Sequence, residues 1–547
     1  MTKKDDKIRQ LNFDDEFLLD AAERRLQNGD YLGALTMLNK RNGMYEPSAD
    51  AAAIAADVYE AMELWQRAAD SWFVFLDTCN EADFSEGYEG LAVCFMNMGE
   101  DLQSTLYFHR VYGDEVEKML KEKKKPKLRL VHSDDGKADE NAVLERGIAL
   151  LQMGELDQAR ELLGQVAPEN EEFASATGLI AMCTLMLGNE EEAEKICETL
   201  LQTHPDNILA LTTYCAVLQS RGDKEGAKNA ALRLNRNPSK KIEDLFRIAT
   251  ALCETGLDEE AFWKLSELLK KIPYDETALY FYAVAAYRTD RMQEAIEALE
   301  RLTTVYPRKA IAKYNLERMR RLADGGKKFK LNYFYRMPKE KYREVADFLL
   351  AASKAEGSEA EFIASLPELN EFFAIAMDEM EGRDEKIQLL AVKVALKTRS
   401  DGFLREVLLD PAANEIVKLS ILHGLTERNE DDSFGTVFLN IYREFFTHRL
   451  ELRGRRKKEF MSAFADVYSK FAFMNDGNEE RIIVAAEDVF DTLNAAGAYE
   501  LLSEREGIAA AVYREARLPH AEHKLERLCK LFGANKSVVE QILDFMM

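Results

Sequence analysis

The sequence GIALLQMGELDQA at residues 147–159 is followed by ATALCETGLDEEA at 249–261 and AVAAYRTDRMQEA at 283–295, with the same order of small and apolar residues. One position in this pattern, here called the anchor, recurs at a constant interval of thirty-four positions in five copies: Gly154, Gly188, Gly222, Gly256 and Asp290. A fixed period of this length predicts a stacked array of helix pairs. The protein is therefore expected to bind through a solenoid.

Small side chains accompany each anchor at two fixed distances. Seven residues before the anchors lie Gly147, Ala181, Cys215, Ala249 and Ala283, and five residues after them lie Ala159, Ala193, Ala227, Ala261 and Ala295. Small residues at these points allow two amphipathic helices to approach closely. Prolines at one shared distance after three of the anchors predict where the second helix of a copy ends: Pro205, Pro273 and Pro307.

This combination of positions resembles the tetratricopeptide repeat. The resemblance implies that the first helix of each pair lines a concave surface, with residues ten, six and three before the anchor facing inward. Cys253 and Arg318 belong to this inward set. The residues expected to form a partner-binding groove are apolar and aromatic: Leu144, Ile148, Met182, Leu185, Phe246, Tyr280, Val284, Tyr287 and Tyr314.

The pattern extends beyond the five copies in both directions. Gly29, Glu63 and Gly99 are three earlier anchors, but the interval from Gly99 to Gly154 exceeds one repeat by twenty-one positions. Residues 308–323 are expected to form a capping helix, because the small positions are lost there. The predicted organisation is three repeats in 1–120, a charged linker or insertion in 121–140, five repeats with a cap in 141–336, and a helical domain in 337–547.

The last segment has helical periodicity without the spacing of the anchors. The predicted fold class is therefore all-α, a tetratricopeptide-type α-solenoid followed by an irregular or HEAT-like helical domain. The HEAT-like element rests on Ile387, Leu390 and Leu396, which recur as Ile416, Leu419 and Leu425. Helices are expected over residues 339–353, 368–380, 385–397, 414–425, 434–448, 457–473, 479–495 and 537–546.

Composition limits the classes of function. The 547 residues carry a formal net charge of -25, which opposes nucleic acid as a general partner. No secretory signal or membrane-spanning stretch is expected. The seven cysteines have no paired short spacing and are interpreted as reduced core residues, so a cytoplasmic protein is predicted.

Motifs that would indicate catalysis are not found. The sequence contains no nucleophile elbow, glycine-rich phosphate loop or HExxH motif. His520, His523 and Cys529 form the one tight group of potential metal ligands, but no fourth ligand is evident. The prediction is a protein that is not an enzyme and has no metal or cofactor.

Three basic segments interrupt the acidic composition. Lys121–Arg129 and Arg449–Lys458 are interpreted either as solvated surface or as contacts for an acidic partner or nucleic acid. The third, Lys327–Tyr335, mixes lysines with aromatic residues, which are expected to fasten the last helix of the array to the next part of the chain.

The preferred function is a noncatalytic scaffold or adaptor that binds an apolar or amphipathic segment of a protein or peptide in the groove. The alternative is a regulator that contacts nucleic acid or an acidic partner through the basic segments. Whether the groove is covered by the chain itself, and whether the protein forms oligomers, stays open. Alanine at Tyr280 and Tyr287 is expected to weaken partner binding by a few kcal/mol at most.

Overall fold

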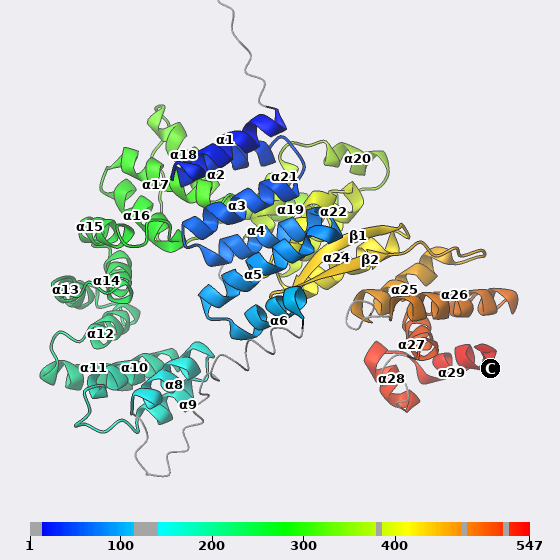
Figure 1. The fold of residues 1–547 in the computed structure, drawn as a ribbon. Helices are drawn as coiled ribbons and strands as arrows, with labels where there is room; N and C mark the ends of the chain where they lie inside the picture. The colour runs from blue at the N-terminus through cyan, green and yellow to red at the C-terminus, as the bar shows by residue number, and fades with distance from the viewer. Residues whose placement is uncertain (1–13, 114–139, 379–384, 472–477, 518–523, 547) are drawn as a thin grey trace, which may run out of the picture. The chain divides into compact units, whose positions relative to one another are not determined.

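The computed structural model describes residues 14–113, 140–378, 385–471, 478–517 and 524–546 (Figure 1). The chain forms two compact units. The first unit comprises Met1–Lys123 and Met337–Met547, and the second unit comprises Lys124–Arg336. The four-segment division expected from the sequence stays a prediction.

In the first unit, the described residues 14–113 form three antiparallel helix pairs. Each pair packs on the next, and the predicted all-helical repeat architecture is confirmed. The pairs are α1 (Asp15–Gln27) with α2 (Tyr31–Asn42), α3 (Ala49–Ala61) with α4 (Trp65–Thr78), and α5 (Phe84–Met98) with α6 (Asp101–Tyr112); the short helix η1 (Glu81–Asp83) precedes α5.

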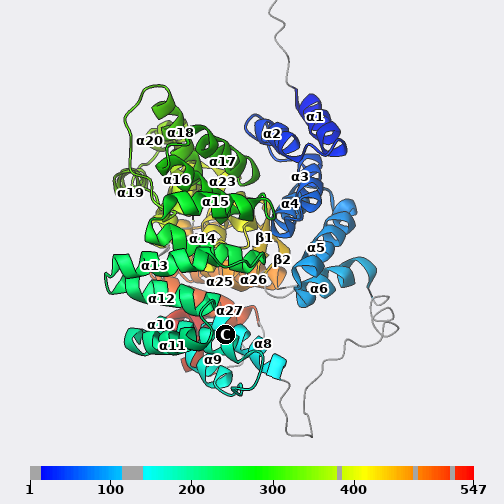
Figure 2. The same ribbon diagram turned by 90° about the vertical axis from the view of Figure 1, so that its left-hand side faces the viewer.

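The second unit continues the same arrangement with five pairs and a final helix (Figure 2). The expected capping helix over 308–323 corresponds to α18 (Ala310–Ala323). The pairs are α8 (Glu140–Gln152) with α9 (Leu156–Leu163), α10 (Phe173–Met186) with α11 (Glu190–Thr203), α12 (Ile208–Ser220) with α13 (Lys224–Asn235), α14 (Ile242–Thr255) with α15 (Asp258–Leu269), and α16 (Glu276–Arg288) with α17 (Met292–Val305).

All eight sequence anchors adopt left-handed backbone conformations, with φ between 58° and 84°. This conformation ends the first helix, and the amide of the next residue then bonds back to a carbonyl near the end of that helix, as in Leu257 N–H to Leu252 O at 3.0 Å. The alanines five residues after the anchors are buried, which lets the second helix pack closely on the first. Glycine suits six anchors because it has no Cβ to oppose positive φ.

The carboxy-terminal part of the first unit is mainly helical. Most of the expected helices are present, and the periodicity missed four others: α20, α23, α27 and α28. The helices are α19 (Lys339–Ala352), α20 (Ser358–Ala364), α21 (Leu369–Met377), α22 (Glu385–Thr398), α23 (Asp401–Leu409), α24 (Glu415–Glu427), α25 (Lys457–Phe471), α26 (Glu479–Ala495), η2 (Leu501–Ser503), α27 (Arg505–Glu515), α28 (Leu525–Phe532) and α29 (Lys536–Met546).

The helix expected over 434–448 is wrong. This stretch forms an antiparallel hairpin of β1 (Asp432–Phe438) and β2 (Ile441–Thr447), in which Phe438 pairs with Ile441. Leu439 and Asn440 both have positive φ, which is the geometry of a tight two-residue hairpin turn. Neither turn residue is glycine, so the usual sequence signal of such a turn is missing.

The hairpin packs on the amino-terminal repeats of the same unit (Figure 1). The Tyr107 hydroxyl of α6 donates to Asn440 O and accepts from Tyr442 N–H, both at 2.8 Å. The Tyr442 hydroxyl donates to Leu76 O of α4 at 3.0 Å, and Asp77 accepts from Gly435 N–H at 2.6 Å. These contacts join chain segments more than three hundred residues apart into one core.

Helices α22 and α23 are connected in the same way as the repeat pairs. Arg399 has φ of 52°, and Ser400 N–H donates to Ala395 O at 3.0 Å. Val392 and Leu404 occupy the positions that are small in the repeats. The turn geometry of a repeat is therefore reproduced here without its sequence signature.

Candidate protein-binding face

The candidate site lies on the inner face of the second unit, defined here as the side of α14, α16 and α18 that contacts residues 327–336. These ten residues, here called the strap, follow α18 and run along α16 from its carboxyl end toward its amino end. The strap contains no helix or strand of its own, and its side chains alternate between buried or half-buried and exposed over residues 329–335. This alternation is the pattern of an extended chain with one face covered.

Side chains of α16 hold the strap by its main chain. The Tyr287 hydroxyl donates to Phe329 O at 2.7 Å and accepts from Phe329 N–H at 3.1 Å. Arg288 Nε donates to Leu331 O at 3.0 Å, and the Tyr280 hydroxyl donates to Asn332 O at 3.2 Å. Hydrogen bonds to backbone groups do not depend on which side chains the bound segment carries.

Alternate side chains of the strap pack into the inner face. Phe329 stacks on Tyr287 with ring centroids 5.0 Å apart, and the Arg318 guanidinium lies 3.8 Å from the centroid of the Phe329 ring. Leu331 is buried. Tyr335 meets Tyr280 edge to face at 4.4 Å. Aromatic and cation–π contacts of this kind add stabilisation beyond the buried area.

Tyr333 contacts Asp258 and Arg288, which form an ion pair with each other. Its hydroxyl donates to Asp258 Oδ1 at 2.7 Å, and the Arg288 guanidinium lies 4.6 Å from the centroid of its ring. Burial raises the pKa of the Tyr333 and Tyr280 hydroxyls above their usual range, so both remain protonated hydrogen-bond donors. Asp258 also pairs with Arg288 at 3.2 Å.

The residues predicted to line the groove differ in their exposure. Leu144, Ile148, Met182 and Leu185 belong to α8 and α10 and are partly exposed. Phe246 of α14 and Tyr314 of α18 are also partly exposed, whereas Val284 is fully buried in α16. Tyr280 and Tyr287 are occupied by the strap. The structure therefore places the predicted set on first helices and α18 but assigns no partner to it.

Residues 327–335 were expected to fasten the array to the next part of the chain. The side chains of Phe329, Tyr333 and Tyr335 instead pack back on the array, on Tyr287, Phe281 and Tyr280 of α16 respectively. The signal for this arrangement is the alternation of Phe329, Leu331, Tyr333 and Tyr335 in the sequence, which is the pattern of an extended segment. Sequence reasoning also missed Asp258 and Arg288, because neither lies at an inward position of the repeat.

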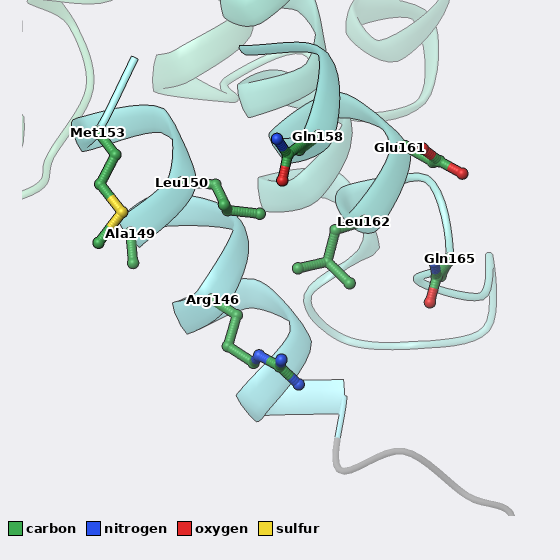
Figure 3. A pocket seen from close by; sticks show the side chains of 8 residues that line it. All are labelled: Arg146, Ala149, Leu150, Met153, Gln158, Glu161, Leu162 and Gln165. Atoms are coloured by element: carbon green, nitrogen blue, oxygen red, sulfur yellow. The ribbon is translucent and has the colours of Figure 1, made fainter. Parts of the chain in front are cut away.

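A depression of about 480 Å³ opens on the first pair of the second unit. Figure 3 shows Leu150 of α8 and Leu162 of α9 on its two sides, with Arg146 at one end. Its remaining lining is mixed: Ala149, Met153, Gln158, Glu161 and Gln165. These residues differ from the predicted groove set, and they form no constellation of catalytic groups.

The other candidate sites give the following results. Lys121–Arg129, His520 and His523 lie outside the described residues, and Cys529 is buried. Among the described residues, no group of three or more His, Cys, Asp or Glu side chains could hold a metal ion.

All seven cysteines are free thiols. Burial raises the pKa of Cys197 and Cys215 to about 12, which opposes formation of the reactive thiolate. In the part of the chain that the structure describes, every helix is too short or too polar to cross a bilayer.

The basic segment Arg449–Lys458 is described, and its arginines and lysines are all exposed. Two of them form ion pairs with neighbours, Arg453 with Glu451 at 3.7 Å and Arg456 with Glu459 at 3.0 Å. Arg455 lies 5.1 Å from the centroid of the Tyr499 ring. The positive charge of this exposed segment is therefore partly offset by Glu451 within it and Glu459 just after it.

A comparison with family models gives a match to part of the second unit. The tetratricopeptide repeat family model matches residues 144–208 and 264–316. The comparison with curated proteins gives no match.

Solved structures similar to this chain include a tetratricopeptide repeat protein from Parabacteroides merdae (15% identity, TM-score 0.27, 51% of this chain and 96% of that chain). Others are the C-terminal part of a TPR repeat-containing protein from Cytophaga hutchinsonii (12%, 0.20, 48% and 98%) and the human IFIT1 dimer with PPP-AAAA (16%, 0.27, 73% and 90%). At these identities and TM-scores, no property of these proteins is transferred to this chain.

Proposed function

The chain carries tetratricopeptide repeats, and on that basis we propose that it is a noncatalytic cytoplasmic adaptor that binds an apolar or amphipathic segment of a partner protein in the predicted groove along α8, α10, α14, α16 and α18. Repeats of this kind generally mediate contacts between proteins. The strap is the observation that carries the proposal. It is a peptide segment with alternating apolar side chains, bound extended on the face that the repeat pattern predicts to be inward.

The partly exposed residues of α8 and α10 provide the more direct test of the adaptor. Tyr280 and Tyr287 contact the strap, so alanine substitutions there alter the strap as well as any partner contact. Ile148 and Met182 do not share this drawback. They pack against the apolar cluster at the start of the second unit, and not against the strap. The substitutions Ile148→Ser and Met182→Ser replace two apolar side chains of this surface with polar ones.

The experiment is affinity capture from the cytosol of the source cells with the full-length chain. The wild type, the Ile148→Ser/Met182→Ser variant and a Met153→Ser control are compared, with circular dichroism to verify folding. Met153 is 75% exposed and directly follows α8, the helix that carries Ile148, but it lies at the depression of Figure 3. The proposal expects a stoichiometric partner that the double variant loses and the control retains. Identical profiles for all three proteins would remove this surface from the function.

A second candidate function rests on the exposed basic side chains of Arg449–Lys458. A nucleic acid or acidic protein bound there would be held by charge, so its affinity is expected to fall steeply between about 50 and 200 mM salt. Fluorescence anisotropy with a labelled single-stranded RNA measures this directly. Absent or salt-insensitive binding of RNA and DNA would contradict the nucleic-acid form of this candidate.

A further inference from the structure

We propose that the inner face of α14, α16 and α18 is a receptor for an extended peptide with aromatic or large aliphatic side chains at alternate positions and a tyrosine at the third of them. In this proposal the strap occupies the receptor until a partner segment with the same chemistry displaces it. The inference rests on the proposed adaptor function and names the class of partner.

The receptor recognises the main chain of whatever segment it holds. Tyr287, Arg288 and Tyr280 supply donors to three strap carbonyls, and Tyr287 also accepts from one strap amide. Any extended segment presents such groups at the same spacing. These contacts therefore require an extended conformation of the bound segment and place no requirement on its solvent-facing residues.

Specificity comes from the side chains that face inward. Phe329, Leu331 and Tyr333 are covered, whereas Phe334 is 69% exposed although it is as apolar as they are. The receptor therefore selects for apolar side chains only at the alternate positions that face inward. The third inward position is the most selective, because Asp258 accepts a hydrogen bond from the Tyr333 hydroxyl at 2.7 Å. Phenylalanine would remove this hydrogen bond to the half-buried Asp258 carboxylate.

The charge of the receptor further restricts its ligand. Asp258 repels an anion at the third position, so an unmodified tyrosine is expected there and a phosphotyrosine is excluded. Arg318 and Arg288 lie against the rings of Phe329 and Tyr333, which favours aromatic residues over aliphatic ones at these two positions. Asp290 pairs with Lys328 at 2.9 Å, an exposed contact that tolerates a basic residue before the first inward position.

Competition follows from the covalent connection of the strap to α18. A tethered segment acts at an effective concentration in the millimolar range for short flexible linkers, so a partner in solution binds well only if it exceeds the strap in affinity or the strap is weakened. Gly325 (φ of 94°) and Gly326 lie between α18 and the strap. The strap therefore joins the helix through residues that allow its direction to change.

The test uses the full-length chain and a fluorescein-labelled decapeptide with the strap sequence, KKFKLNYFYR, in an anisotropy titration. The strap-weakened variant is Phe329→Ser/Tyr333→Ser, and its matched control is Lys330→Ser/Phe334→Ser at two solvent-facing positions. The proposal expects the strap-weakened variant to bind the peptide at least about tenfold more tightly than the wild type. The control variant is expected to bind like the wild type.

Two altered peptides test the specificity with the strap-weakened variant. A peptide with Tyr333→Phe is expected to bind about tenfold or more weakly, and a peptide with Phe334→Ser is expected to bind as the parent does. Equal loss from both peptides would overturn the positional specificity. A strap-weakened variant that keeps its circular dichroism and thermal transition but gains no affinity would overturn the receptor itself.

If the double variant does not fold, the full-length Tyr333→Phe variant replaces it, because this change removes a single hydroxyl. The proposal then expects a gain of at least about threefold in peptide affinity over the wild type, and no gain would overturn it. The outcome is separable from that of the adaptor test. Peptide binding with unchanged capture by the Ile148→Ser/Met182→Ser variant would leave the receptor standing and remove the α8 and α10 surface.

Discussion

At the residue scale, the backbone conformation of the anchors explains why glycine recurs at most of them. Gly256 has φ of 73°, and a Cβ added there would meet no atom within 4 Å, so the cost of a side chain is conformational and not steric. We expect Gly256→Ala to lower the free energy of unfolding by about 1 kcal/mol. The matched control is Gly402, which lies within α23 and likewise has no atom within 4 Å of an added Cβ.

Gly402→Ala is expected to raise the free energy of unfolding by roughly 0.5–1 kcal/mol. Calorimetry of both variants therefore checks that Gly256→Ala destabilises the protein and Gly402→Ala stabilises it.

The buried Lys418 makes a second prediction at this scale, for the dependence of stability on pH. Burial lowers the pKa of Lys418 from 10.5 to about 8, while its ammonium donates to Val437 O. Because the unfolded chain holds this proton up to a higher pH, Lys418 contributes a gain in stability between pH 8 and about 10. Burial raises the pKa of the Cys197 and Cys215 thiols and of the Tyr107 and Tyr442 hydroxyls, so these groups lower the stability from about pH 9 upward.

The measurement is urea unfolding at a series of pH values, with Lys418→Met as the comparison. Methionine carries no titrating group, so the free energy of unfolding of the wild type relative to that of Lys418→Met should rise between about pH 8 and 10. A difference that stays constant over this range would assign the pH dependence to other groups.

At the scale of elements, the hairpin and α6 depend on one hydroxyl. Tyr107 bonds both Asn440 O and Tyr442 N–H, and its side chain is fully buried. Tyr107→Phe leaves two backbone groups without these bonds, so we expect a loss of about 1–3 kcal/mol in the free energy of unfolding. Tyr112 is on the same helix and bonds Glu89 at the exposed surface. Tyr112→Phe should therefore leave the free energy of unfolding almost unchanged, and a similar loss from both variants in urea unfolding would refute the assignment.

The helix prediction over 434–448 failed at this scale for an identifiable reason. Aromatic and aliphatic residues occur so densely there that they satisfy a helical period as well as an alternating one. The turn at Leu439–Asn440 is held by the surrounding contacts, including those of Asn440 and Tyr442 with Tyr107, and not by a glycine. Local propensity is a weak guide where tertiary contacts decide the conformation.

At the scale of the whole molecule, the first unit consists of two pieces of chain that lie on either side of the second unit in sequence. Tyr107, Leu76 and Asp77 in the first piece bond the hairpin in the second. Coexpressed fragments 1–123 and 337–547 are therefore expected to copurify, with only one fragment tagged. The Tyr107→Ala substitution should reduce recovery of the untagged fragment, and Tyr112→Ala should not. Failure of the wild-type fragments to associate would contradict a shared core.

The repeats could be predicted from the sequence alone. The constant period of the anchors, with small residues at fixed offsets, specifies eight helix-pair turns, because each turn needs a left-handed residue and two close helix contacts that are local in sequence. Three inward residues that contact the strap also follow from that period, namely Tyr280, Tyr287 and Arg318. The segment that binds the inner face could not be predicted in this way. The repeat pattern specifies the helix pairs and carries no information about what they bind.

The placement of the hairpin on α4 and α6, and of the strap on α16, became apparent only in the folded protein. Both depend on bonds between groups far apart in sequence, such as Tyr442 with Leu76 and Tyr333 with Asp258. Such pairs leave no periodic trace, since one partner is often a backbone carbonyl that every residue possesses. The periodicity of the sequence therefore determined the helix pairs. Long-range burial and hydrogen bonding determined which surfaces of these pairs the hairpin and the strap cover.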